Sequence, residues 1–106
     1  MSLQNRLRYI GAALAQVTTA YHYWRPNLAP PFLVWAEESS EDFFANGRNA
    51  EQKIAGTVDF YTKTEFDPTI DAIQEKMEEI GLTYTIDSVQ YEDETNLIHY
   101  SWNWWQ

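Results

Sequence analysis

The stretch 57-TVDFYTKTEFDPTIDAIQEKMEEIG-81 decides the fold, because it predicts a strand followed directly by a helix. Its first part, TVDFYTK over 57–63, alternates: Val58, Phe60 and Thr62 point to one side of the chain, and the residues between them point to the other. An alternation of this kind predicts a β-strand with one face turned toward a core.

The second part of the stretch predicts a helix over 68–80. Asp67-Pro68 is typical of a helix start, because Asp caps the first N–H groups and Pro is favoured in the first turn. Gly81 is well placed to end the helix as the residue after the C-cap. Between these two signals the apolar residues recur at steps of three and four and mark one buried face: Ile70, Ile73, Met77 and Ile80.

Downstream, we expect a hairpin that pairs roughly 82–91 with 97–104. The apolar alternation changes phase near Asp87-Ser88, which indicates a β-bulge. An acidic turn over 92–96 separates the two strands. One face of the last strand is aromatic and aliphatic, and we expect its two tryptophans to fill the core under the helices: Ile98, Tyr100, Trp102 and Trp104.

Upstream, an apolar stripe predicts a helix over 3–21 that is finished by Arg25-Pro26: Leu3, Leu7, Ile10, Leu14, Val17 and Tyr21. A proline-rich loop follows. The unbroken apolar run Phe32–Trp35 then predicts a strand that is buried on both faces or central in a sheet. Over 37–56 the dipeptide Asn46-Gly47 favours a hairpin or a partly mobile excursion.

These elements predict a single domain over 1–106. The fold class is α+β, a mainly antiparallel sheet with two helices on one face, in the order α-β-(ββ)-α-β-β. Each helix carries a single apolar stripe, so both helices are expected to pack on the same side of the sheet.

Charge is the most informative bulk property. The formal net charge is −9, but residues 1–36 hold three arginines and no acid, whereas residues 37–106 hold all sixteen acids and four bases. A segment this acidic repels phosphate, which argues against a nucleic-acid-binding groove. Two interpretations stay open: a solvated acidic face that keeps the protein soluble, or a surface that lies near DNA without binding it.

Little in the sequence points to catalysis, and we expect no enzyme, no cofactor and no metal. There is no cysteine, which excludes disulfides, zinc thiolates and a cysteine nucleophile. A metal site would have to bring His22 and His99 together with Glu37, Glu38 or Glu92, and no short ligand spacing exists. Neither a nucleophile elbow nor a Gly-rich phosphate loop is present. The adjacent carboxylates are expected to face solvent.

The sequence contains no apolar run long enough to span a membrane and no recognisable signal peptide. We therefore expect an intracellular or virion-assembled protein.

The order of elements and three motifs resemble a known family. PFLVW at 31–35, VDFYTK at 58–63 and IHYSW at 98–102 accompany the Asp-Pro-capped helix that ends in Gly. This pattern resembles the small tail-terminator, or tail-completion, proteins of long-tailed phages and prophages, also called head–tail joining proteins. The resemblance implies a non-enzymatic hexameric ring that stops growth of the tail tube and docks to the head connector.

The same resemblance implies the partners and the location. The partners are other copies of the chain, tail-tube proteins and head-connector proteins, and DNA passes through the ring without specific binding. The location is a virion or prophage-derived particle, and the host cytoplasm during assembly.

The residues expected at the subunit interface come from three regions. Arg6 and Arg8, together with Arg25, lie in the acid-free part of the chain and are expected to meet acidic parts of a neighbour. Phe43 and Phe44 belong to the 37–56 excursion. Trp105 ends the last strand, and Trp is enriched at interfaces. The alternative function is an acidic monomeric binding module, such as a DNA-mimic or immunity-type inhibitor of a basic protein.

Overall fold

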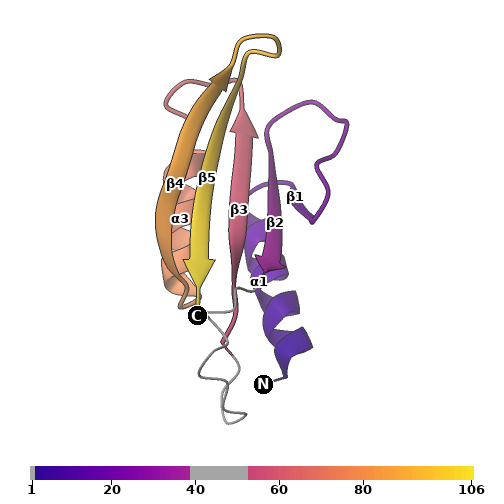
Figure 1. The fold of residues 1–106 in the computed structure, drawn as a ribbon, viewed down its shortest axis with the longest axis vertical. Coiled ribbons are helices and arrows are strands. Elements are labelled where there is room, and N and C mark those ends of the chain that lie inside the picture. Colours follow the sequence, from indigo (N-terminus) through magenta and orange to yellow (C-terminus); the bar gives the residue numbers. More distant parts are fainter. Residues whose placement is uncertain (1, 39–52) are drawn as a thin grey trace.

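The computed structural model describes residues 2–38 and 53–106 as two helices on one face of a five-stranded sheet (Figure 1). The strand order is β1-β2-β3-β5-β4, and among these strands only β1 and β2 run parallel. The elements are α1 (Leu3–Val17), β1 (Ala20–His22), β2 (Phe32–Glu38), β3 (Ala55–Thr62), α3 (Thr69–Glu79), β4 (Thr83–Glu92) and β5 (Leu97–Trp105). The predicted α+β class and its order of elements are confirmed.

The main core lies between the two helices and the sheet. Ile10 and Leu14 of α1 and Ile73 and Met77 of α3 are fully or almost fully buried against it. The sheet supplies the other side of the core from alternate positions of β2, β3 and β5: Leu33, Trp35, Val58, Phe60, Trp102 and Trp104. The expectation that Trp102 and Trp104 fill the core under the helices is confirmed.

Helix α3 is held at both ends by hydrogen bonds from residues that the sequence signals. It begins at Thr69, one residue later than expected, so Pro68 and not Asp67 is the N-cap residue. The Asp67 carboxylate still accepts a hydrogen bond of 2.9 Å from the Thr69 N–H. At the other end Gly81 has φ +82°, and its N–H donates to Glu78 while the Leu82 N–H donates to Met77. This pair of bonds is a Schellman motif, which satisfies the last carbonyls of the helix.

Replacing Asp67 by Ala is expected to lower the free energy of unfolding at pH 7 by about 0.5–2 kcal/mol, the usual cost of a lost cap. Burial opposes the charged form, but hydrogen bonds from Thr62 and Thr69 outweigh it and hold the pKa of Asp67 below its ordinary value. The stabilisation is therefore complete above the unfolded-state pKa of about 3.9 and is lost as the pH falls through the lower folded-state pKa.

Urea titrations of both proteins from pH 7 down to about pH 3 measure this difference. Glu65→Ala, which removes an exposed carboxylate from the same loop, is the control and should leave the stability almost unchanged. A difference at pH 7 no larger than that of the control would contradict the capping role.

The first helix is shorter than its apolar stripe predicts, and the expected helix end is wrong. α1 stops at Val17, and Thr18 is already extended. Tyr21 lies in β1, which pairs in parallel with β2, and the Leu33 N–H donates to the Thr19 carbonyl. The apolar spacing continues past Val17, but pairing with β2 takes this segment into the sheet because tertiary context overrides local propensity.

The remaining strands follow the sequence pattern closely. Phe32–Trp35 is buried at all four positions and lies between β1 and β3, as expected. The register of β4 against β5 shifts between Ile86 and Ser88, which confirms the predicted bulge. The Asn46-Gly47 hairpin signal lies outside the described residues; β2 runs to Glu38 and β3 begins at Ala55.

Candidate functional site

The helix-free face of the sheet carries a row of stacked rings from three neighbouring strands. Phe32 of β2 stacks on Tyr61 of β3 with ring centroids 5.0 Å apart, and Tyr61 stacks on His99 of β5 at 4.2 Å. The strand register aligns these three positions side by side. Tyr21 of β1 adds an edge-on contact to Phe32. This face is therefore partly covered by its own aromatic side chains, and neither α1 nor α3 lies on it.

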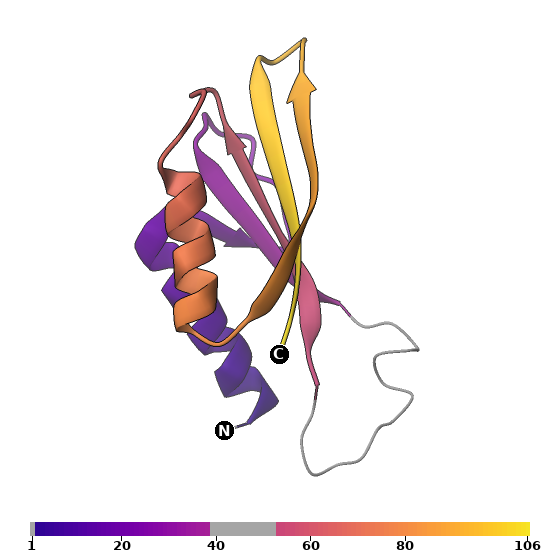
Figure 2. The ribbon, with the colours of Figure 1, turned by 90° about the vertical axis from the view of Figure 1, so that its left-hand side faces the viewer.

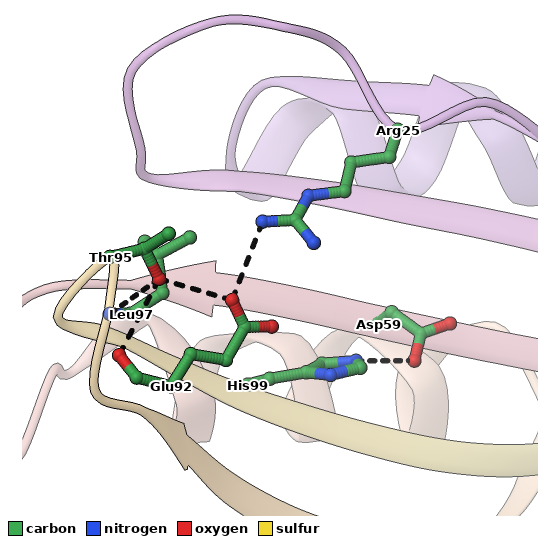
Figure 3. A network of polar contacts seen from close by, with 6 residues as sticks. All are labelled: Arg25, Asp59, Glu92, Thr95, Leu97 and His99. Carbon is green, nitrogen blue, oxygen red and sulfur yellow. Dashed lines mark hydrogen bonds and ion pairs between the residues drawn. The ribbon is translucent and has the colours of Figure 1, made fainter.

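Charged side chains lie beside this row, and Figure 3 shows two of their pairs, Arg25 with Glu92 and Asp59 with His99. The Arg25 guanidinium lies 4.4 Å from the Tyr61 ring centroid, and its Nη2 lies 3.7 Å from Oε2 of Glu92. His99 Nε2 and Asp59 Oδ1 are 2.7 Å apart. Burial, reinforced by the charge of Asp59, raises the pKa of Tyr61, and the charge of Arg25 opposes this. Through Arg25 these contacts link the proline-rich loop to Tyr61 of β3 and to Glu92 at the end of β4.

An open cleft of about 700 Å³ adjoins this network, between the loop that begins at Arg25 and the β4–β5 turn. Its walls combine two cations with apolar side chains: Arg25, Lys63, Leu28, Phe32 and Leu97 are among them. In the Asp59–His99 pair a carboxylate contacts an imidazole nitrogen, an arrangement that can orient a histidine as a general base. However, neither residue lines the cleft, so the pair has no substrate-sized cavity beside it there.

The second histidine lies on the other side of the sheet, at its β1 edge. His22 is sandwiched between the rings of Tyr23 and Trp35, at centroid distances of 3.9 and 4.0 Å. Its Nε2 lies 2.6 Å from the Glu37 carboxylate, which also accepts a hydrogen bond from the Tyr23 hydroxyl. Burial raises the pKa of Glu37, but the bonds from Tyr23 and His22 outweigh it and lower the pKa overall.

The two histidines thus have separate carboxylate partners, Glu37 for His22 and Asp59 for His99. Of the other two carboxylates considered for a metal site, Glu92 pairs with Arg25 and Glu38 is exposed at the end of β2. Within residues 2–38 and 53–106, no three metal-ligating side chains come together.

The predicted interface residues that the structure describes lie on different elements. Arg6 donates a hydrogen bond of 3.0 Å to the Gln106 side chain, and Arg8 is exposed on α1 with a 3.4 Å contact to Asn5. Trp105 is 36% exposed at the end of β5. Phe43 and Phe44 lie outside the described residues. The third cation of the acid-free region, Arg25, is paired with Glu92 of its own chain.

A surface that the sequence interpretation missed lies on β4, the outermost strand of the sheet. Ile86, Val89 and Tyr91 face the helix side of the sheet, yet they are 52%, 54% and 58% exposed. We call these three residues the β4 row. Figure 2 shows the reason: the β4–β5 hairpin extends well past α3, so neither helix of the described residues lies under its outer half.

The apolar alternation on both sides of the phase change, which includes Ile86, Val89 and Tyr91, is visible in the sequence, but alternation alone indicates a buried face. Only the strand order reveals that β4 is at the edge and that its apolar side is left uncovered.

No helix among the described residues combines the length and the apolar character needed to cross a membrane. Comparison with known proteins finds no matching family and no similar curated sequence. Among solved structures, the crystal structure of the periplasmic domain of XcpY is similar, with a TM-score of 0.51 and 13% identity over 97% of this chain and 99% of that chain. At this identity the likeness is one of fold alone.

Proposed function

We propose that this chain is a structural subunit that assembles with copies of itself into a ring, as a phage tail terminator. The observation that carries the proposal is the β4 row. Apolar side chains and free backbone groups along an exposed edge strand invite pairing with another chain, and proteins that stay monomeric usually blunt or cover such an edge. A surface of this kind suits a subunit whose partner covers it after folding.

The resemblance of the sequence to tail terminators supplies the particular assembly. In that setting the ring has six subunits, caps the tail tube and meets the head connector, and DNA slides through it. The net charge of −9 supports this role, because a strongly acidic wall repels the phosphates that pass it.

Sedimentation velocity with light scattering, over a range of salt and protein concentrations, tests the proposal. A hexamer has six times the 12.5 kDa mass of one chain. Six subunits of charge −9 repel one another, and this repulsion is screened beyond about 8 Å at physiological ionic strength. We therefore expect rings to be weakest at low salt and to become more stable as the salt approaches the physiological range.

Binding to the ends of purified tail tubes is the second readout, because a tube can template a ring that is weak in solution. A protein that remains monomeric at all salts and high concentration, and that does not bind tubes, would overturn the proposal. Tight binding of that monomer to a basic protein would instead favour the acidic binding module.

A further inference from the structure

We infer that the β4 row is covered, in the assembled protein, by the outer face of α1 from a second copy of the chain. The inference rests on the proposed ring and names the two surfaces that would meet in it. The neighbour's α1 would extend the helix layer under the part of the hairpin that α3 does not reach.

The lengths of α3 and β4 show that α3 is too short to cover the whole strand. α3 has 11 residues and spans about 16 Å, whereas β4 has 10 residues and spans about 33 Å. α3 touches β4 near its start, where the Tyr84 hydroxyl donates to Glu78, and this bond raises the pKa of Tyr84 to about 12. Beyond that contact, the β4 row continues along the strand without a helix.

The outer face of α1 has the composition of a docking helix. One side of α1, with Ile10 and Leu14, is buried in the core of its own chain. The opposite side is exposed, and its largest side chain is Tyr9, which is 54% exposed. Around Tyr9 this side carries one cation and two small residues: Arg8, Ala12 and Ala15. Alanines let a helix approach a strand closely, and Tyr is enriched at interfaces.

Charge complementarity selects the second copy as the partner of the row. The outer face of α1 carries Arg8, and Leu3–Val17 contains no acid, whereas the hairpin has no base over 83–97 and keeps three acids besides Glu92, which is paired with Arg25: Asp87, Asp93 and Glu94. Complementary charges favour contact between α1 and the hairpin, and like charges disfavour contact of either surface with its own counterpart. The contact is therefore head-to-tail, and head-to-tail contacts can close into rings.

The same chain cannot make this contact. α1 lies under the β1–β2 side of the sheet and α3 lies between it and the hairpin (Figure 1). A link between the outer face of α1 and the β4 row therefore has to join two molecules.

Cross-linking between introduced cysteines tests the inference, since the chain has none of its own. Tyr9→Cys and Val89→Cys are made in separate proteins, mixed under conditions in which rings form, and treated with a short bismaleimide. We expect a covalent dimer from the mixture and little from either protein alone. The matched control replaces Val89→Cys by Gln90→Cys, which is also exposed but faces the opposite side of the same strand.

The outcomes separate this inference from the proposed function. Rings that form normally but give no more cross-link with Val89→Cys than with Gln90→Cys would overturn the inference and leave the ring intact. Absence of assembly of the unmodified protein both in solution and on tail tubes would overturn the ring itself.

A charge reversal gives a second readout that needs no cross-linker. Arg8→Glu is expected to weaken assembly by about tenfold while leaving the thermal unfolding midpoint unchanged. Lys63→Glu makes the same charge change at an exposed site outside both surfaces and outside the 37–56 excursion, and it is the control. Equal weakening by the two variants would show that net charge, and not this contact, governs assembly.

Discussion

Trp102→Ala is expected to destabilise the protein by about 3–5 kcal/mol, a large part of the stability of a domain of this size. The Trp102 ring is completely buried between the helices and the sheet, and its Nε1 donates a hydrogen bond of 2.9 Å to the Gln74 side chain. The substitution leaves a cavity that the rigid sheet cannot close, and it leaves the Gln74 oxygen without this donor.

Chemical denaturation followed by circular dichroism measures this loss. The stability of Trp102→Phe should lie between that of the unmodified protein and that of Trp102→Ala, because the variant keeps an aromatic ring but removes the hydrogen bond. Trp24→Ala is the matched control: Trp24 is 75% exposed, and its loss should cost less than about 1 kcal/mol. Similar costs for the two alanine variants would contradict the assignment of Trp102 to the centre of the core.

Gly56→Ala should cost at least about 3 kcal/mol, at the upper end of the range for overpacking. Gly56 lies in β3, where an added Cβ would lie 2.0 Å from the Ala36 carbonyl oxygen and 2.5 Å from the Trp104 ring. The first of these atoms belongs to the backbone of the paired strand, and the second to a buried ring. Neither can move aside without disturbing the sheet.

The control for this variant is Gly81→Ala. Gly81 has φ +82°, but the nearest atom to an added Cβ is 3.9 Å away, so the substitution introduces backbone strain without a clash. Its cost should be about 1–2 kcal/mol. If Gly56→Ala were no more costly than Gly81→Ala in the same denaturation assay, β2 and β3 would not lie as closely together as described.

The parts of the fold that the sequence predicts well are those whose signals are local. The Gly81 end and the alternation of Val58 and Phe60 depend on residues close in the chain, and both are found. The Asp67-Pro68 signal is also local, and it places the helix start within one residue. The end of the first helix depends on a distant partner. Tyr21 continues the helical spacing, and only pairing with β2 shows that it belongs to a strand.

The surfaces were harder to predict, because they depend on which strands become neighbours. Asp59 and His99 are 40 residues apart in the sequence, and it is the pairing of β3 with β5 that brings them together. Arg25 likewise has a partner in its own chain, Glu92 at the end of β4, whereas the sequence suggests a partner in another chain. Arg8 and Trp105 were selected from charge and position alone, and their role in assembly stays a prediction.

The bulge at Asp87 sets which changes of length β4 can accept during evolution. Because the bulge places one extra residue in β4, Ile86 and Val89 face the same side of the sheet although they are three positions apart. Deletion of that residue would remove the bulge and restore plain alternation, with Ile86, Val89 and Tyr91 still on one side. A homologous chain can therefore lose this residue, or change in length at the turn after Glu92, and keep the same apolar face. Any further change within β4 should come in pairs, because a shift of one residue turns the following side chains to the opposite side.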